Sequence, residues 1–376
     1  MISPDNAVVP LVEVEQVRAQ VDALLTEHVD GLAAELSSLS PDADHLTRAM
    51  RSMLSGGKRL RAAFCYWSWR AHSPSPSAEG SVTGLQEVLR VGAALELFQA
   101  AALFHDDVMD NSDTRRGHPT AHRRFERLHS EKGWTGEAPH FGVSAAILLG
   151  DLALIASERE FSRALRDLPA TTRASAALVF DRMRTEVTAG QFLDVLGQVL
   201  PWGTDPVADE SRARTVIRSK SARYSIEHPV SLGAALAGAD TERLAVCRAV
   251  GLPLGEAFQL RDDLLGVFGD PRTTGKPAGD DLREGKRTVL VARVMQHADE
   301  ADRLLVQESL GRLDLSEEDV SRLRQAIQRS GAVAGVERLI SELSEPALEM
   351  LRTADLAEPG RGMLVSLGRA AVERTS

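Results

Sequence analysis

Hydrophobic residues recur at intervals of three and four positions along almost the entire chain, and this spacing predicts helices from one end to the other. Nowhere do apolar and polar residues alternate as they do in a half-buried strand. Two stretches, 142–156 and 230–239, carry little charge, so we expect them to be central and shielded on most sides. The predicted helices span residues 13–38, 43–72, 84–110, 142–167, 171–198, 211–237, 241–268, 285–308, 316–330, 332–354 and 360–373.

Loops are predicted where Pro, Gly and Ser interrupt this spacing, at residues 73–77, 130–140 and 201–206. None of these loops is long enough or simple enough in sequence to be a domain linker. We therefore expect residues 1–376 to form a single all-α domain, with residues 1–12 disordered.

The formal net charge of −10 argues against non-specific nucleic-acid binding. Cys65 and Cys247 both lie in apolar helical surroundings, which is more typical of packed thiols in a reducing cytosol than of a disulfide. The N-terminus has no basic segment followed by an apolar core, as a signal peptide would, and no run approaches 18 apolar residues without a charge. The expectation is a cytoplasmic protein without a transmembrane segment or a nucleic-acid partner.

Two acidic clusters lie inside apolar helical sequence: Asp106-Asp107-Val108-Met109-Asp110 and Asp262-Asp263-Leu264-Leu265-Gly266. Carboxylates four residues apart share one face of a helix and repel each other there. One such cluster alone is more often a solvated helix face, but two of them in apolar surroundings favour metal binding. Mg²⁺ takes one or two carboxylates together with phosphate oxygens of a substrate. The two clusters therefore predict diphosphate chemistry.

Three glycine-containing segments carry cations: residues 55–61 (SGGKRLR), 111–120 (NSDTRRGHPT) and 274–288 (TGKPAGDDLREGKRT). Glycine lets backbone amides approach an anion, while Lys and Arg supply positive charge to phosphate oxygens. Each segment alone could be a basic surface turn. Because each acidic cluster is followed by such a loop, the sequence predicts two anions bound side by side.

With these ordered motifs, which cover roughly residues 45–300, the chain resembles the trans-isoprenyl diphosphate synthases of the polyprenyl synthetase family, and most closely the bacterial geranylgeranyl diphosphate synthases. The resemblance implies an all-α bundle around a deep central cavity, in a homodimer. It also implies a head-to-tail condensation of isopentenyl diphosphate with an allylic diphosphate of C5 to C15. The implied cofactor is Mg²⁺, with three ions in each active site.

The resemblance also implies roles for individual residues. Metal ions would be held by Asp106, Asp107, Asp110, Asp262 and Asp263. Isopentenyl diphosphate would contact Gly57, Lys58, Arg61, Gln99 and Arg116. The allylic diphosphate would contact Arg115, Lys220, Ser221, Gln259, Lys276 and Lys286, among which Arg115, Lys220 and Lys276 would assist its ionisation together with the aspartates. Polar residues near the reacting centre would be Gln191 and Asp194.

Four features depart from the family pattern. Gly266 stands where the second cluster often ends in Asp, Gln99 where His is common, and Ser221 where Thr is common. The chain ends Glu373-Arg374-Thr375-Ser376, without a basic tail to close over the substrate. The sequence therefore does not predict how the active site closes.

Product length can be predicted from helix geometry, because a growing chain should pass the residues upstream of Asp106 on the same helix. Each turn rises about 5.4 Å, close to one extended isoprene unit. Ala102 and Ala101 would leave the first turn open, whereas Phe98 would form a floor one turn deeper. This pattern favours a C20 product, with C15 and C25 as alternatives. Ordinary core packing is the competing interpretation of Phe98.

Other functions were weighed against this one. A class I terpene cyclase also ionises an allylic diphosphate, but it needs no second diphosphate site such as the one that residues 55–61 predict. A non-catalytic regulatory subunit of a heteromeric prenyl synthase would typically have lost an aspartate motif. A di-iron carboxylate bundle would need Glu-x-x-His pairs, which we do not find at suitable positions.

Overall fold

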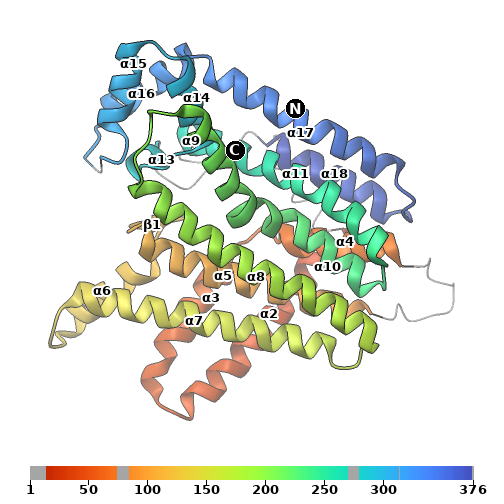
Figure 1. Ribbon diagram of the computed structural model, residues 1–376. Coiled ribbons are helices and arrows are strands. Elements are labelled where there is room, and N and C mark those ends of the chain that lie inside the picture. The colour runs from red at the N-terminus through yellow and green to blue at the C-terminus, as the bar shows by residue number, and fades with distance from the viewer. Residues whose placement is uncertain (1–13, 74–83, 270–278, 313, 375–376) are drawn as a thin grey trace.

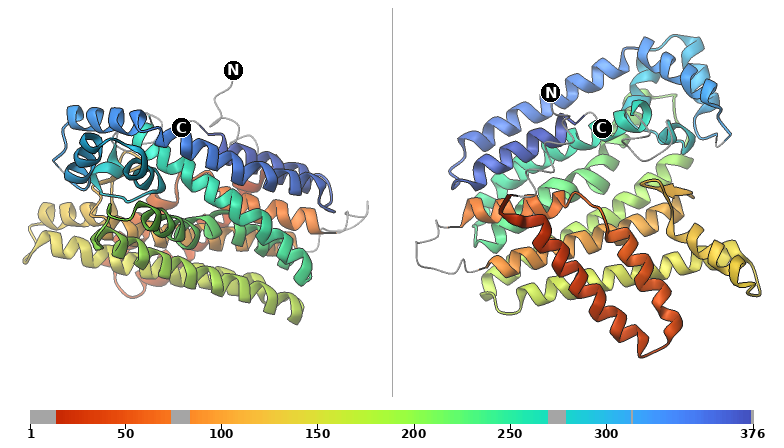
Figure 2. Two further views of the ribbon diagram at one scale, coloured as in Figure 1. Left: turned by 45° about the horizontal axis from the view of Figure 1, so that its top comes forward. Right: turned by 180° about the vertical axis from the view of Figure 1, so that it is seen from behind.

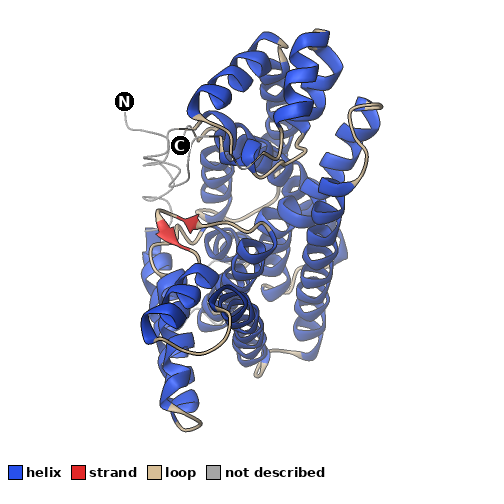
Figure 3. Cartoon of the chain, turned by 90° about the vertical axis from the view of Figure 1, so that its left-hand side faces the viewer, coloured by secondary structure: helices blue, strands red, loops and turns tan. Residues whose placement is uncertain are grey.

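The computed structural model describes residues 14–73, 84–269, 279–312 and 314–374, and this part of the chain is almost entirely helical (Figures 1, 2 and 3), which confirms the predicted all-α class. The predicted disorder of residues 1–12 lies outside the described residues. The elements are η1 (Val14–Gln16), α2 (Val17–Ser37), η2 (Pro41–Ala43), α3 (Asp44–Leu54), α4 (Leu60–His72), α5 (Leu85–Met109), β1 (Thr114–Arg115), β2 (His118–Pro119), α6 (Ala121–Lys132), α7 (Ala138–Leu165), α8 (Ala170–Val199), α9 (Pro206–Val216), η3 (Ile217–Glu227), α10 (His228–Leu236), α11 (Thr241–Phe268), α13 (Asp280–Arg283), α14 (Val289–His297), α15 (Glu300–Ser309), α16 (Glu317–Arg329), α17 (Ala332–Thr353) and α18 (Gly360–Val372).

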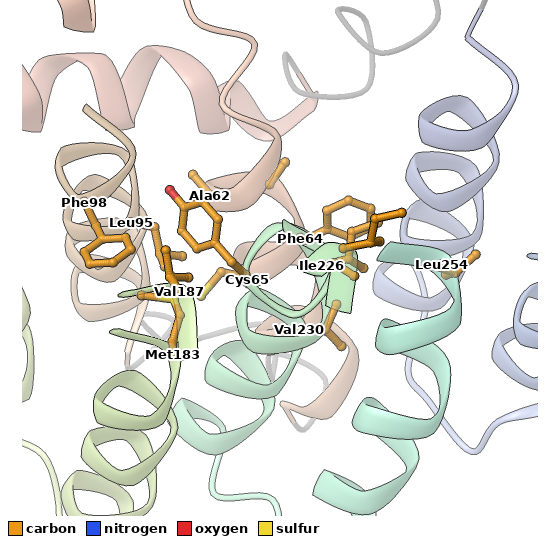
Figure 4. Close-up of a cluster of buried hydrophobic side chains, with 14 of the residues drawn as sticks. Ala62, Phe64, Cys65, Leu95, Phe98, Met183, Val187, Ile226, Val230 and Leu254 are labelled. Carbon is orange, nitrogen blue, oxygen red and sulfur yellow. The ribbon is translucent and has the colours of Figure 1, made fainter. Parts of the chain in front are cut away.

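The hydrophobic core is continuous across the bundle and is centred on α4, α5 and α10. Helix α5 packs against α7, α4 and α2, and α10 packs between α4, α8 and α11. In Figure 4, Phe98 of α5 and Met183 of α8 form one end of the core, which continues through Ile226 to Leu254 of α11. All nine residues of α10 are buried, as the low charge of this stretch predicts.

Helix α7 is less shielded than its composition predicts. It turns small residues such as Ala146 and Gly150 inward, where a Cβ atom added at Gly150 would lie only 2.3 Å from His105 Nε2. Its opposite face leaves Leu148 and Ile155 exposed. Both α5 and α7 are long and apolar enough to cross a membrane by length and composition, but the apolar window of α5 is 72% buried and that of α7 only 44%. The α5 value is that of a core helix, whereas α7 has an apolar face that the single chain does not cover.

Several helix boundaries differ from the prediction. The predicted helix 43–72 is two helices, α3 and α4, with Gly56 and Gly57 between them, and the predicted helix 285–308 is divided into α14 and α15. The predicted loop 130–140 is wrong at both ends, because α6 continues to Lys132 and α7 begins at Ala138. Helix α6 was missed because its sequence is strongly polar. It forms by packing a narrow face, which includes Phe125, against α7.

A short β-hairpin follows the first acidic cluster, although the sequence predicts no strand. Thr114 pairs with Pro119 and Arg115 with His118 in antiparallel register. The two turn residues, Arg116 and Gly117, have φ values of +52° and +74°. Positive φ at both central residues is typical of the tight type I′ turn. Strands of two residues are too short to produce an alternating pattern in the sequence.

The predicted helix 211–237 contains a π-helical segment, η3. Glycines of two neighbouring helices make room for this wider coil. A Cβ atom added at Gly190 of α8 would lie 2.4 Å from Lys220 N, and one added at Gly255 of α11 would lie 2.1 Å from Ala222 O. Both contacts are with the backbone of η3, so no side-chain rotation could relieve them. Close backbone approach therefore fixes the position of η3, and π-helical segments often occur at functional sites.

We expect Gly255→Ala to destabilise the protein by about 1–3 kcal/mol, because the added methyl group overlaps the Ala222 carbonyl. The matched control is Gly31→Ala in α2, where nothing lies within 4 Å of the added Cβ atom. That change should be neutral or stabilising, by up to about 1 kcal/mol, because Ala favours helices over Gly. Urea unfolding followed by circular dichroism measures both. Equal stability of the two variants would contradict the proposed packing of η3.

Candidate active site

The first acidic cluster lies at the C-terminal end of α5, where the hairpin and η3 each bring a cation to it. Arg115 of the hairpin donates from Nε to Asp107 Oδ1 at 2.6 Å and from Nη2 to Asp106 Oδ2 at 3.3 Å. Lys220 of η3 donates to Asp106 Oδ1 at 3.0 Å and to Asp194 Oδ2 of α8 at 2.6 Å. The structure therefore brings together Asp106, Asp107, Asp194, Arg115 and Lys220, to which the resemblance assigns site roles.

The two outer aspartates of this cluster differ in acidity. Burial alone would raise the pKa of Asp106, but the nearby charges of Lys220 and Arg115 hold it well below its ordinary value. Burial and the adjacent charge of Asp106 raise the pKa of Asp110 to about 6. Oxygen Oδ1 of Asp110 is buried and receives no hydrogen bond. The neighbouring side chains therefore neutralise the negative charge at Asp110 only in part.

Lys286 connects the first cluster with the loop that follows the second. Its Nζ lies 2.5 Å from Glu284 Oε2, 3.4 Å from Asp281 Oδ1 and 3.7 Å from Asp110 Oδ2. These acidic neighbours raise the pKa of Lys286 well above its ordinary value despite the opposing effect of burial. Lys286 is thus a charged ammonium group held between the two regions.

The second cluster occupies the end of α11. Asp263 is buried and accepts a hydrogen bond from Gln259 Nε2 at 2.8 Å. Burial, with smaller contributions from Asp281 and Asp262, raises the pKa of Asp263 to about 8. The side chain of Asp262 is 54% exposed and pairs with Arg374 at 2.6 Å. The Arg374 guanidinium also lies 4.3 Å from the centre of the Phe258 ring. Arg374 therefore places one cation on the second cluster.

A second group of cations includes Arg61 of α4 and Arg116 of the hairpin. The Arg61 guanidinium stacks 4.2 Å from the centre of the Tyr224 ring, and its Nη2 donates to Ser225 Oγ at 3.0 Å. Burial and the charges of neighbouring arginines, Arg115 and Arg61 among them, lower the pKa of Arg116. Positive groups gathered closely enough to disfavour one another's charge form a site suited to an anion.

Arg59, in contrast, serves the fold. Its buried side chain donates to Asp22 Oδ1 at 2.7 Å and to Glu96 Oε2 at 3.2 Å, and it also donates to the Leu54 carbonyl. With a φ of +54°, Arg59 turns the chain sharply between α3 and α4. This turn places exposed Lys58 and buried Gly57 at the start of α4, near Arg61.

Tyr224 is a site residue that the sequence analysis missed. Its hydroxyl donates to Gln99 Oε1 at 2.6 Å, and its ring meets Phe98 edge-on with centroids 5.4 Å apart. It therefore links the predicted isopentenyl diphosphate pocket with the predicted floor. The sequence did offer one indication of its role: Tyr224 lies four residues after Lys220 and is one of only two tyrosines in the chain.

The remaining predicted residues occupy various positions. Gln191 of α8 lies beside Met109, with Nε2 3.8 Å from its Sδ. Ser221 follows Lys220 on η3. Lys276 lies outside the described residues. On α5, Ala101 and Phe98 are buried in the core, and Ala102 is half-buried. Two surface pockets, one between α7 and α8 and one between α11, α17 and α18, are lined by no residue of the two acidic clusters. The deep central cavity stays a prediction.

The donor set suits a hard divalent cation. Among the described residues, no three His, Cys, Asp or Glu side chains already converge on a metal position. Mg²⁺ does not require such a cage, because it retains water and takes one or two carboxylates together with phosphate oxygens. Asp110, with a buried oxygen that accepts no hydrogen bond, fits this requirement.

Comparison with known proteins places this site in a family. The family model for polyprenyl synthetase matches residues 43–328. The chain is 30% identical over 342 residues to geranylgeranyl diphosphate synthase of Mycobacterium tuberculosis, covering 90% of this chain and 88% of that protein. It is 31% identical over 312 residues to geranylfarnesyl diphosphate synthase of Aeropyrum pernix, covering 81% of this chain and 86% of that protein.

Among solved structures, the fold is similar to that of geranylgeranyl pyrophosphate synthase from Corynebacterium glutamicum, which was crystallised with isoprenyl diphosphate and magnesium. The TM-score is 0.87 with 36% sequence identity, over 98% of this chain and 99% of that one. The matched segment includes both acidic clusters and all three cation-bearing loops. The chain therefore belongs to the polyprenyl synthetase family and is a trans-isoprenyl diphosphate synthase.

Proposed function

We propose that this protein condenses isopentenyl diphosphate with an allylic diphosphate to give geranylgeranyl diphosphate, and that the reaction depends on Mg²⁺. The observation that carries the proposal is the presence of two cation groups. Lys220, Arg115 and Lys286 pair with the aspartates of the first cluster, whereas Arg61 stacks on the aromatic ring of Tyr224 and lies close enough to Arg116 for their charges to repel. A terpene cyclase has no need for the second group. The solved relative that was crystallised with isoprenyl diphosphate and magnesium supports the same assignment.

Each cation group has a distinct task in the proposed reaction. Lys220 and Arg115 would turn from the carboxylates to the allylic diphosphate and stabilise the negative charge that develops as its C–O bond breaks. Arg61 and Arg116 would hold isopentenyl diphosphate with its double bond close to the cationic carbon. Bound Mg²⁺ would add positive charge against the leaving group. The departing diphosphate would accept the proton that the adduct loses.

We also propose that the protein is located in the cytoplasm.

The C20 product is proposed from the residues of α5. Ala101 is fully buried, and Phe98 is buried one turn further from Asp106, where it packs against Tyr224. Figure 4 shows Phe98 next to Leu95 of α5 and Val187 of α8, so these side chains would end a channel that runs along α5. The relatives include a geranylgeranyl and a geranylfarnesyl diphosphate synthase, so membership in the family leaves the product length open.

A homodimer is proposed from the exposed apolar face of α7 and α8. Large apolar side chains exposed on two packed helices are typical of an interface. A second copy of the chain is the occupant we propose, because two symmetric copies can cover the same apolar face on each other. The exposed residues on this face are Ile147, Leu148, Leu154, Ile155, Leu178, Phe192, Val195 and Val199.

We predict that Asp106→Asn lowers kcat by at least about 100-fold, because the variant loses the charge that pairs with Lys220 and would hold the metal. The control is Asp30→Asn, which changes an exposed aspartate of α2 paired with Arg51. Turnover of isopentenyl diphosphate with C5, C10 and C15 primers measures the effect. An Asp106→Asn variant that retains more than about a tenth of the activity would count against the metal role.

Product length should follow the side chains of α5. Phe98→Ala should lengthen the product beyond C20 by removing the floor, and Ala101→Phe should shorten it towards C15 by blocking the first turn. Phe161→Ala serves as control, because Phe161 is a buried phenylalanine of α7 that stacks on Phe180. Both Phe→Ala variants should lose about 3–5 kcal/mol of stability, but only one should change the product. Chromatography of the dephosphorylated products decides, and unchanged lengths in both α5 variants would rule out the floor.

Leu148→Glu should convert the proposed dimer to a monomer, because it buries a charge in an apolar interface. Leu304→Glu on α15 is the matched control, since Leu148 is 62% and Leu304 51% exposed, and α15 lies on the other side of the molecule from α7 (Figure 1). Sedimentation velocity distinguishes the two species. A wild-type protein that sediments as a monomer, or a Leu148→Glu variant that remains dimeric, would contradict this interface.

A further inference from the structure

The glycine that ends the second acidic cluster is packed against another carboxylate. A Cβ atom added at Gly266 would lie 1.8 Å from Asp281 Oδ2 and 2.5 Å from Asp281 Cγ. Gly266 lies within α11 and has no positive φ value, so the helix backbone does not require glycine there. Glycine in a helix interior costs about 1 kcal/mol relative to Ala. Space for the Asp281 carboxylate is a physical reason for glycine at this position.

Asp281 also contacts the residue that connects the two clusters. Its Oδ1 lies 3.4 Å from Lys286 Nζ, and its backbone carbonyl accepts a hydrogen bond from Lys286 N at 3.0 Å. The same ammonium group lies 3.7 Å from Asp110. Asp281 therefore holds both the backbone and the side chain of Lys286 within reach of the first cluster.

An independent feature indicates that this region receives a cation. The side chain of Asp110 is only 3% exposed, and its Oδ1 accepts no hydrogen bond, although Lys286 approaches its other oxygen. A buried carboxylate oxygen without a donor carries a desolvation cost that a bound cation removes. Asp110, Lys286 and Asp281 are thus connected by ion pairs, and the buried Oδ1 of Asp110 is available to a cation.

We propose that Asp281 supplies the third carboxylate of the second acidic cluster, in the space that Gly266 leaves open, and that it positions Lys286 between the two clusters for the binding of a magnesium–diphosphate complex. This inference rests on the proposed function. Asp281 reaches the cluster from α13, after the loop, instead of from α11 itself. When Asp110 binds the metal, Asp281 would still pair with Lys286 and would hold its ammonium group towards the diphosphate. Asp281 is a positioning residue in this arrangement.

An exchange of the two side chains tests the proposal. The variants are Asp281→Asn, Asp281→Gly, the exchange variant Gly266→Asp with Asp281→Gly, and Asp280→Asn, which removes the neighbouring carboxylate on α13 as a matched control. The first readout is Mn²⁺ binding in the presence of inorganic pyrophosphate, measured by electron paramagnetic resonance. The second is the Mg²⁺ concentration that gives half-maximal turnover of isopentenyl diphosphate.

Asp281→Asn and Asp281→Gly should each weaken Mn²⁺ binding and raise the required Mg²⁺ concentration by about 10-fold or more, as the loss of groups that orient metal ligands does elsewhere. Asp280→Asn should stay within about twofold of the wild type on the same scale. The exchange variant should regain most of what Asp281→Gly loses, because the carboxylate returns to the cluster and the space at position 281 is free.

Wild-type metal affinity in Asp281→Asn would overturn this inference, and so would an exchange variant no better than Asp281→Gly. In either case wild-type binding and turnover would leave the proposed function intact. A wild-type protein that neither binds Mn²⁺ with pyrophosphate nor consumes isopentenyl diphosphate would overturn both. If the exchange variant does not fold, as circular dichroism would show, the isosteric Asp281→Asn decides alone.

Discussion

The site depends on one electrostatic constraint, which is that several carboxylates share a partly buried space at the end of α5. Lys220 lies between Asp106 and Asp194, and Lys286 pairs with Asp110, so these cations offset the repulsion among the three carboxylates. Without those cations, mutual repulsion and desolvation would favour protonated or displaced carboxylates. A diphosphate needs the same cations. Under the proposed function, substrate binding is therefore an exchange of partners, in which Lys220, Arg115 and Lys286 turn from carboxylate to phosphate.

The scaffold has to deliver these cations from distant parts of the chain to one place. Lys220 arrives because Gly190 and Gly255 let the π-helical segment η3 lie against the backbones of α8 and α11. Arg115 arrives because a tight turn at Arg116 and Gly117 folds the hairpin back onto α5. Lys286 is held by the backbone and side chain of Asp281. Each delivery uses a backbone conformation or close approach that an ordinary helix would not provide.

This contrast between ordinary helices and special backbone conformations explains how much of the structure the sequence could predict. Long helices with regular apolar spacing were predicted almost to the residue, as with α11 (Thr241–Phe268), and the two acidic clusters were identified from spacing alone. The missed elements lack such a pattern. Helix α6 is mostly polar and forms through its contact with α7, the hairpin is too short, and η3 keeps a helical sequence while its hydrogen bonding changes. Tyr224 was missed because its contacts with Gln99, Phe98 and Arg61 come from other helices.

The C-terminus extends the same argument to the second cluster. The sequence left closure of the active site undecided, whereas the structure places Arg374 on Asp262, the more exposed of the cluster's two aspartates. Arg261, the residue before Asp262, helps to fix the position of the segment that carries Arg374. It donates to the Val372 carbonyl at 2.9 Å and pairs with Glu337 of α17, which fixes the end of α18 beside α11. Stacking on Phe258 then directs the Arg374 guanidinium at the carboxylate. Asp262 thus has its own counter-charge, supplied by the end of the chain, as Asp106 has Lys220. In each cluster one aspartate therefore pairs with a cation, Asp106 with Lys220 and Asp262 with Arg374, and under the proposed function each cation would be displaced when the metal binds.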